Sequence, residues 1–300
     1  MPDVVQLFTV PAGGDVLLRP LETVPEATTV HDAFERLGLG GSVYTGLRTF
    51  ERVRFLALEE HLDRTERSMR LLGWRDAETR LDRERVRRAL AELVRGRDGD
   101  VVIRLDVLPP GTTAGTGDHV VLTVAPLHEV PGRFLREGVR VLLARDLTRD
   151  RPRIKTAEFV LRRRPYPLNT QEAFEHLMLD REDRILEATS ANFYVVLDGV
   201  VHTAWSGVLE GITRLLCLRV AAAAGIEVRR EAVPLFRLAD AGEAFLTSST
   251  RGVVPVVEVA GTRIADGTPG PITRRLMDDL SAESLRIARP AWPLDPVAAR

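Results

Sequence analysis

The sequence predicts an α/β protein, of the α+β kind, that folds as two domains. Its 300 residues exceed the usual length of one domain, and 44% of them are hydrophobic, which is enough for two cores. Stretches with the apolar alternation of strands are interspersed with stretches that carry apolar residues at helical spacing. The Pro- and Gly-containing segment 128–135 interrupts this pattern. It is the expected linker between a small domain at 1–127 and a larger one at 136–288.

The first half of the small domain predicts strands. Within residues 1–30, short apolar runs are broken by Pro and Gly, as in edge strands. Apolar residues then alternate with polar ones from Val43 to Phe50. A turn at residues 51–52 and a second apolar run follow, so this stretch predicts a hairpin.

Two helices and two further strands complete the small domain. Amphipathic spacing predicts one helix from about residue 59 to Gly73, where a glycine is a common stop, and a second from about residue 81 to Val94. The apolar runs 101–109 and 119–127 predict two strands with a buried face.

The larger domain predicts an antiparallel meander followed by helices. The pair Asp198–Gly199 between apolar runs is typical of a type I′ hairpin turn. A helix is expected between Gly211 and Gly225, a strand pair within 243–266, and a last helix over 271–288. Residues 289–300 form a Pro-rich tail.

Charge and motif content argue against several classes of protein. The net charge of -1 gives no basic excess for nucleic acid or anionic lipid, so we expect neither partner and a small-molecule ligand instead. The single cysteine, Cys217, and the lack of a signal peptide or a long apolar span favour a cytoplasmic protein. Histidines lack metal-ligand spacing, so no metal site is predicted, and no glycine-rich stretch matches a dinucleotide fingerprint.

Lys155 is the only lysine in the chain, although lysine and arginine together number 42. Arginine serves as well as lysine for surface charge, but a guanidinium stays protonated and is a poor nucleophile. An amine can lose its proton and form a Schiff base with a carbonyl. The retained lysine therefore indicates amine chemistry, unless it is simply a surface residue.

Three further features after Lys155 offer the other groups that a pyridoxal 5'-phosphate site needs, namely a carboxylate for the ring nitrogen and donors for the phosphate. Glu187, in a predicted hairpin, could pair with a pyridine nitrogen. The helix start with Ile212 and Thr213 offers backbone N–H groups, a favourable dipole and a hydroxyl to a phosphate. A hydroxyl-rich strand end at residues 247–250 offers further donors. Taken alone, Glu187 and Thr213 also suit ordinary surface and first-turn positions.

The chain resembles the class IV aminotransferases of pyridoxal-phosphate fold type IV, which include branched-chain and D-amino acid aminotransferases and aminodeoxychorismate lyase. The resemblance is carried by six stretches in the family's order: SVYTGLR (42–48), EEHLDR (59–64), RIKT (153–156), ILEATSANFYVV (185–196), LEGITR (209–214) and FLTSSTRGVVPV (245–256). It implies a small N-terminal α/β domain, a larger C-terminal pseudo-barrel domain, an active site in the cleft between them, and a homodimer.

The resemblance also implies roles for individual residues. Lys155 would hold the cofactor as a Schiff base and move the substrate Cα proton, and Glu187 would pair with the pyridine nitrogen. The phosphate would be bound by residues from three elements, namely Arg64, Ile212, Thr213 and Ser249. The substrate would contact Tyr44, Arg48, Thr250 and Arg251.

The implied reaction moves an amino group from an amino acid (branched-chain, D-amino or related) to a 2-keto acid. A lyase of the aminodeoxychorismate type and a non-catalytic protein that binds the cofactor remain alternatives. Four departures from the family pattern concern the substrate. Glu158 stands where an Asn is usual, Leu39 and Val160 where branched-chain enzymes carry a Tyr, and Ala188 where a Gly is common. Arg251 replaces a small residue in the turn, and it would suit an acceptor with a second carboxylate, such as 2-oxoglutarate.

Overall fold

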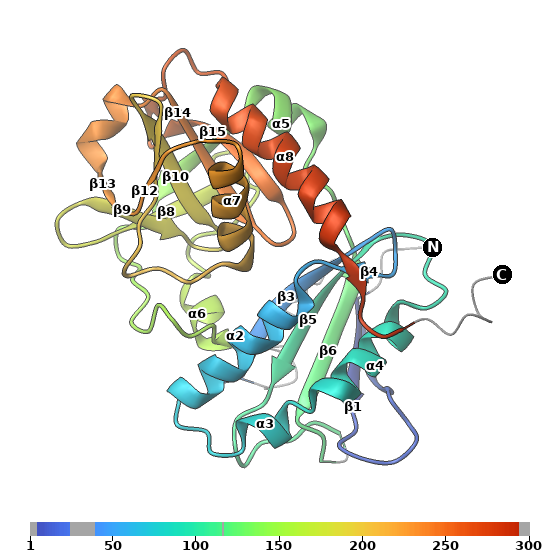
Figure 1. Cartoon of the computed structure of the whole chain (residues 1–300). Coiled ribbons are helices and arrows are strands. Elements are labelled where there is room, and N and C mark those ends of the chain that lie inside the picture. The colour runs from blue at the N-terminus through green and yellow to red at the C-terminus, as the bar shows by residue number, and fades with distance from the viewer. Residues whose placement is uncertain (1–4, 25–39, 116, 294–300) are drawn as a thin grey trace. The chain divides into compact units, whose positions relative to one another are not determined.

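The computed structural model describes residues 5–24, 40–115 and 117–293 (Figure 1). The chain divides into two compact units. Unit 1 takes the chain up to His128, the segment Ile154–Val160 and the chain from Leu285 on. Unit 2 takes Glu129–Arg153 and Leu161–Ser284. The segment that contains Lys155 therefore groups with unit 1, although it lies within the range expected for the larger domain.

Unit 1 is built on an antiparallel sheet whose described strands run in the order β17-β4-β3-β5-β6-β1-β2. The strands are β1 (Val5–Val10), β2 (Arg19–Val24), β3 (Val43–Phe50), β4 (Arg54–Phe55), β5 (Val101–Val107), β6 (Val120–Pro126) and β17 (Arg289–Pro290). The predicted hairpin is β3–β4, and its turn residues Glu51 and Arg52 both have positive φ. The first residues of the predicted tail form β17, which pairs with β4.

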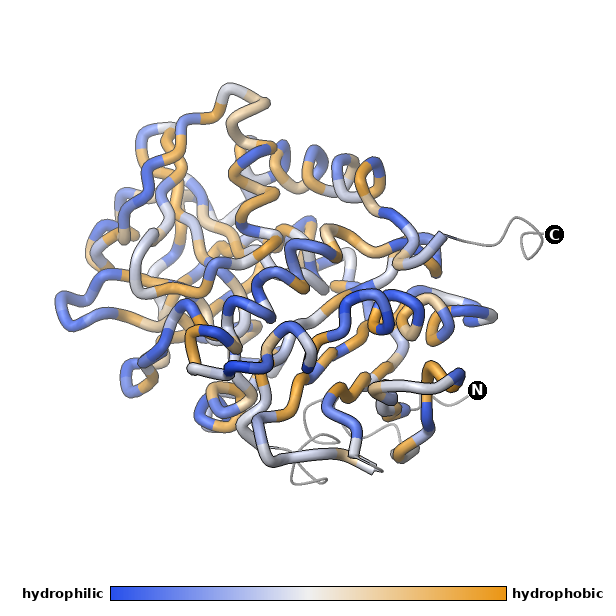
Figure 2. The backbone as a smooth tube through the Cα atoms, turned by 60° about the horizontal axis from the view of Figure 1, so that its bottom comes forward, coloured by the Kyte–Doolittle hydropathy of each residue, from blue (hydrophilic) through white to orange (hydrophobic). Residues whose placement is uncertain are grey.

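The helices of unit 1 are α2 (Leu58–Leu71), α3 (Ala77–Arg80) and α4 (Arg83–Val94). Burial alternates along β3, and its inward residues Val43 and Leu47 share a core with Leu62 of α2 and Leu90 of α4. In Figure 1, α2 and α4 lie along the sheet, and Figure 2 shows hydrophilic and hydrophobic residues mixed along the backbone. Both predicted amphipathic helices are confirmed.

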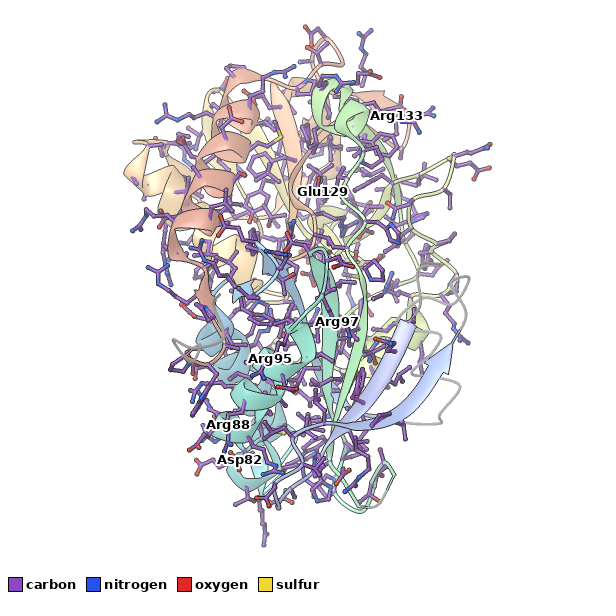
Figure 3. All side chains as sticks on the ribbon, turned by 90° about the vertical axis from the view of Figure 1, so that its right-hand side faces the viewer. Asp82, Arg88, Arg95, Arg97, Glu129 and Arg133 are labelled. Atoms are coloured by element: carbon purple, nitrogen blue, oxygen red, sulfur yellow. The ribbon has the colours of Figure 1, made fainter. Side chains whose placement is uncertain are left out.

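Helix α4 is fixed at both ends by polar side chains (Figure 3). At its start, the Asp82 carboxylate accepts a hydrogen bond from the Arg85 amide at 3.0 Å, which satisfies one of the unpaired N–H groups of the first turn. Past its end, Arg97 donates to the Leu93 carbonyl at 2.7 Å and to the Gln6 side chain at 2.9 Å. Arg97 thus ties the end of α4 to β1.

Unit 2 is built on a sheet that closes into a barrel. Its strands are β7 (Val139–Leu143), β8 (Glu175–Leu179), β9 (Arg184–Ala188), β10 (Asn192–Leu197), β11 (Val200–His202), β12 (Val228–Arg229), β13 (Val233–Pro234), β14 (Glu243–Ser248), β15 (Gly252–Val259) and β16 (Thr262–Arg263). The ring runs β10-β14-β15-β7-β8-β9, and the pairing of Asn192 with Glu187 closes it. Strand β7 is parallel to β8 and β15, and the other ring pairs are antiparallel. The expected pseudo-barrel is confirmed.

The helices of unit 2 are α5 (Gly132–Glu137), α7 (Ile212–Ala223), the 3-10 helix η1 (Leu235–Asp240) and α8 (Pro271–Ile287), whose last residues group with unit 1; α6 (Ala157–Arg162) is also divided between the units. The sequence pattern predicts α7 and α8 but neither α5 nor α6. Asp198 and Gly199 have φ of 50° and 78°, which confirms the predicted turn between β10 and β11. Cys217 is buried in α7, and burial raises the pKa of its thiol to about 12.

Candidate active site

The backbone of Lys155 is held against β3 in unit 1. Its carbonyl accepts a hydrogen bond from the Tyr44 amide at 3.0 Å, and the next residues continue the contact through the Val43–Thr156 bridge and an Ala157 to Ser42 bond at 2.9 Å. The Lys155 amide also donates to the Ser68 hydroxyl of α2 at 3.4 Å. Lys155 is therefore half-buried, and its backbone is hydrogen-bonded to β3 and α2. Both observations argue against an incidental surface position.

The Lys155 side chain lies over an aromatic ring. Its Nζ is 4.7 Å from the centre of the Tyr44 ring, and the guanidinium of Arg104 is 4.1 Å from the centre of the same ring. Contacts of this kind stabilise a cation by about 0.5–1 kcal/mol at exposed sites and by more where water is excluded. Tyr44, a predicted substrate contact, thus stands beside the predicted catalytic amine within one unit.

Arg104 and Asp106 of β5 form a buried ion pair that the sequence analysis does not identify. Two bonds of 2.6 and 2.8 Å join the guanidinium to the carboxylate, and the Ser42 hydroxyl donates to the same carboxylate at 2.6 Å. Burial alone would lower the pKa of Arg104, but the charge of Asp106 raises it. Two charged residues at alternate positions of an otherwise apolar run are the signal that could have indicated this pair.

Arg64 lies on α2, and its side chain is buried. Its Nη2 donates to the Thr45 hydroxyl of β3 at 2.9 Å, and Thr45 also contacts His61 at 2.7 Å. Burial lowers the pKa of His61 well below its ordinary value, and the positive charges of Arg64 and Lys155 lower it further. The charges of Arg64, predicted to bind phosphate, and of Lys155, the predicted catalytic residue, therefore both lower the pKa of His61.

Arg48, the other residue of β3 expected to bind substrate, has contacts at the far end of the strand. Its Nη2 lies 3.8 Å from the Asp100 carboxylate, its Nε donates to the Thr49 carbonyl at 3.3 Å, and its guanidinium stands 4.5 Å from the Phe50 ring centre. Tyr44 and Arg48 share one face of β3, because four residues along a strand restore the same side.

Glu187 of β9 is buried in unit 2 at the point where the barrel closes. Its carboxylate accepts bonds from the Leu209 amide at 3.1 Å, from the Asn192 side-chain amide at 3.1 Å and from Arg149 at 2.9 Å. An ionised carboxylate is the form that accepts from several N–H donors and pairs with an arginine. Arg149 is missed by the sequence analysis, because nothing local separates it from the neighbouring arginines at 145, 151 and 153.

The start of α7 leaves backbone N–H groups without helical partners. The Leu215 amide makes the first helical bond, to the Gly211 carbonyl at 3.0 Å, so the amides of Ile212 and Thr213 precede the hydrogen-bonded ladder. A Cβ at Gly211 would stand 2.1 Å from the Asn192 side-chain oxygen. Glycine is therefore needed where α7 approaches the amide that holds Glu187.

The turn between β14 and β15 contributes hydroxyl groups beside α7. The Thr213 hydroxyl lies 3.4 Å from the Ser249 hydroxyl, which brings two of the predicted phosphate ligands together. Thr250 follows in the same turn and is half-buried. Hydroxyls and helix N-terminal amides are the groups that bind phosphate oxygens in proteins.

Arg251 ends the same turn and is bonded to the barrel. Its Nε donates to the Ser248 hydroxyl at 3.0 Å, and its Nη2 donates to the Ser190 hydroxyl at 2.7 Å and lies 3.2 Å from the Glu175 carboxylate. Glu175 is fully buried and also accepts from Thr189 and from the His176 and Ser190 amides. Two nitrogens of the Arg251 guanidinium, which the sequence predicts to contact the substrate, are thus hydrogen-bonded to other side chains of the protein.

The four residues that depart from the family pattern differ in their surroundings, and Val160 and Ala188 are buried. Glu158 is exposed on α6, whereas Leu39 lies outside the described residues. Within the described ranges, no helix has the length and apolar character needed to cross a membrane, and no cluster of at least three His, Cys, Asp or Glu residues could hold a metal ion.

Comparisons with known proteins agree on one family. The sequence profile described as amino-transferase class IV matches residues 42–259. The D-alanine aminotransferase of Bacillus licheniformis is 28% identical over 249 residues, which cover 80% of this chain and 87% of that protein.

Solved structures show the same fold. A branched-chain aminotransferase from Thermoproteus uzoniensis with norvaline is 23% identical, with a TM-score of 0.68 and coverage of 97% of this chain and 100% of the other. The PLP-bound form of a hypothetical aminotransferase from Mycobacterium tuberculosis is 20% identical, with a TM-score of 0.70 and coverage of 94% and 99%.

Proposed function

Because the chain belongs to the class IV aminotransferase family and is a pyridoxal 5'-phosphate-dependent transaminase, we propose that it moves an amino group between a branched-chain, D-amino or related amino acid and a 2-keto acid. The observation that carries this proposal is the placement of the only lysine, Lys155, on backbone hydrogen-bonded to β3 and beside Tyr44. The substrate classes come from the D-alanine and branched-chain aminotransferases that the chain resembles.

The residues of unit 2 fit the cofactor's phosphate and ring nitrogen. Amides at the start of α7 and the hydroxyls of Thr213 and Ser249 gather where an anion would be stabilised by the helix dipole. Glu187 presents a carboxylate held by Arg149, Asn192 and the Leu209 amide. We propose that Glu187 binds the protonated pyridine nitrogen. Ile212, Thr213 and Ser249 would bind the phosphate, together with Arg64 of unit 1.

Lys155 would hold the cofactor and then move a proton. When bound, pyridoxal 5'-phosphate accepts the electron pair that is released as the substrate Cα–H bond breaks. Lys155 Nζ would take the Cα proton as a neutral amine and donate it again as an ammonium, and an amine suits both tasks. Tyr44 would stabilise the ammonium form through its ring.

We propose that Tyr44, Arg48, Thr250 and Arg251 contact the substrate. Tyr44 is supported by its position against Lys155, and Thr250 by its place next to Ser249. Arg251 has two of its nitrogens bonded to Ser248, Ser190 and Glu175, so it would offer a carboxylate the N–H groups of one nitrogen rather than a fork of two nitrogens.

The half-reaction tests this function. The purified protein is mixed with one amino donor at a time and no acceptor, and absorbance is followed for conversion to the pyridoxamine form. The panel includes both enantiomers of alanine, leucine and valine. A transaminase converts to the pyridoxamine form with its donor. An aminodeoxychorismate-type lyase would instead keep its starting spectrum with these donors and would release pyruvate only when aminodeoxychorismate is added in a separate assay. No response to any donor, together with no pyruvate from aminodeoxychorismate, would indicate a protein that binds the cofactor without catalysis.

The lysine assignment has its own test. Borohydride reduction of the loaded protein should attach the cofactor to the peptide that contains Lys155, since the chain has no other ε-amine. Recovery of this peptide unmodified from fully reduced protein would contradict the role of Lys155. We also propose that the protein is a homodimer, and sedimentation of the active enzyme would test this.

A further inference from the structure

The buried side chains of Arg64, Thr45 and His61 form a hydrogen-bonded chain in unit 1. The proposed function gives a role to Arg64 but none to Thr45 or His61. The Arg64 Nη2 donates to the Thr45 hydroxyl at 2.9 Å, and the same hydroxyl lies 2.7 Å from His61 Nδ1. The exposed fractions are 4% for Arg64, 0% for Thr45 and 3% for His61, so water does not compete with these bonds. A buried polar chain of this kind fixes the groups at its ends.

The elements place these side chains together for a simple reason. His61 and Arg64 are three residues apart on α2, so they project from the same face of the helix. Thr45 lies on the face of β3 whose side chains are buried. The Thr65 and Ser68 hydroxyls on the same helix bond instead to backbone carbonyls one turn earlier. Arg64 therefore donates across to β3, where the Thr45 hydroxyl accepts its hydrogen bond.

The Arg64 bond has one possible direction, whereas the direction of the Thr45–His61 bond depends on the tautomer of the imidazole. A guanidinium only donates, so Arg64 uses one lone pair of the Thr45 oxygen. The one hydroxyl proton of Thr45 is then free to point at His61 Nδ1, which accepts it when that nitrogen carries no proton. The lowered pKa of His61 favours the neutral imidazole, and with the ring proton on Nε2 its Nδ1 is the acceptor.

We infer that His61 is a positioning residue which, through Thr45, orients the guanidinium of Arg64 toward the phosphate of the cofactor. The inference rests on the proposed function, in which Arg64 binds that phosphate. Neutral His61 fixes the direction of the Thr45 hydroxyl, and the fixed hydroxyl selects one orientation of the Arg64 Nη2. A charged His61 would instead repel Arg64, since both would be cations in a buried site.

The alternative is that the chain only fastens α2 to β3. In that case its loss would lower the stability of the protein and weaken every ligand of the site alike. A positioning role predicts a loss confined to ligands that carry a phosphate. Pyridoxal lacks the phosphate but keeps the ring and the aldehyde, so the ratio of its dissociation constant to that of pyridoxal 5'-phosphate separates the two roles.

The experiment measures both dissociation constants by absorbance titration of the apoprotein for the wild type and five variants. Thr45→Val and His61→Leu remove the chain, whereas Thr45→Ser and His61→Asn keep a hydroxyl and an acceptor in place. Arg64→Ala serves as the reference. We expect Thr45→Val and His61→Leu to weaken pyridoxal 5'-phosphate about 10-fold while pyridoxal changes by less than about 2-fold. Thr45→Ser and His61→Asn should restore most of the affinity.

The outcomes separate this inference from the function on which it rests. If Arg64→Ala leaves the ratio unchanged, Arg64 does not bind the phosphate and that part of the proposed function fails. If Arg64→Ala lowers the ratio while Thr45→Val and His61→Leu do not, the positioning role alone is overturned. Equal weakening of both ligands by His61→Leu, with a lower melting temperature, would also overturn it. Should Thr45→Val not fold, His61→Leu and its partner His61→Asn decide the question by the same ratio.

Discussion

Arg149 Nε lies 2.9 Å from Glu187 Oε1, and the two side chains are 7% and 3% exposed, so the proposed partner of the pyridine nitrogen is one half of a buried ion pair. The pair spans 38 residues and meets where β9 and β10 close the barrel of unit 2. A buried pair costs more to break than an exposed one, because the remaining charge loses a hydrogen-bonded counter-charge while staying out of water.

Arg149→Ala should lower the free energy of unfolding by about 3–5 kcal/mol, since it leaves the Glu187 carboxylate without its arginine. Arg145→Ala is the matched control, because Arg145 belongs to the same segment but pairs with Asp183 at 3.0 Å with both side chains more than half exposed. The control should cost less than about 1 kcal/mol. Urea unfolding of the apoproteins measures both, and similar values for the two variants would contradict a stabilising pair.

Glu187→Gln should retain the cofactor and lose most of the transamination, by about 100-fold or more in kcat. An amide still fills the space and can accept from Arg149 and the Leu209 amide, but it does not stabilise a protonated pyridine as a carboxylate does. Single-turnover absorbance with one amino donor measures the step directly. Turnover close to that of the wild type would mean that another acid has this role.

The buried carboxylate of Glu175 should make the protein sensitive to acid. Burial raises the pKa of Glu175, but the charge of Arg251 and the bonds from Ser190, His176 and Thr189 outweigh it and hold the pKa below the ordinary 4.5. A lowered folded pKa means that the unfolded chain binds the proton more tightly. The stabilisation is therefore complete above pH 4.5 and is lost as the pH falls through the lower folded value.

Glu175→Gln tests this directly. The variant should be less stable than the wild type at pH 7, and the difference should shrink as the pH falls below 4.5. Urea unfolding at several pH values measures both curves. Asp240→Asn, at an exposed pair with Arg237, provides a control that should follow the wild-type curve. A constant difference between Glu175→Gln and the wild type at all pH values would exclude titration of Glu175 as the cause.

Local patterns predict most of the elements that carry these residues. The Asp198–Gly199 turn, the helix that begins after Gly211 and the hairpin of β3 and β4 are each specified by residues close together in the chain. The candidate lysine and carboxylate also follow from the sequence, because a sole lysine and the order of motifs need no three-dimensional information.

The partners of the candidate residues do not follow from local patterns. Arg149 meets Glu187 only because the barrel closes, and Arg104 stacks on Tyr44 only because β3 and β5 are paired in a particular register. In a chain whose basic residues are almost all arginine, spacing alone does not separate a buried arginine from an exposed one. The small helix α5 is likewise hidden in a Pro- and Gly-containing segment that favours a linker.

The last prediction concerns Arg251, whose Nη2 lies 3.2 Å from Glu175 and 2.7 Å from the Ser190 hydroxyl. If Arg251 also binds the second carboxylate of an acceptor, Arg251→Ala should raise the apparent KM for 2-oxoglutarate by about 10-fold, the equivalent of roughly 1.4 kcal/mol. The KM for pyruvate should change less, because pyruvate has no second carboxylate. Steady-state kinetics with a fixed amino donor and each acceptor measure the two values.

Arg237→Ala is the control for Arg251→Ala, since Arg237 is an exposed arginine of η1 in the same unit. It should leave both KM values unchanged. An equal rise for the two acceptors would make Arg251 a general support of the turn that holds Ser249, which its bonds to Ser248, Ser190 and Glu175 would explain. A lower melting temperature without any change in KM would restrict Arg251 to its ion pair with Glu175, and the carboxylate of the acceptor would then need another donor.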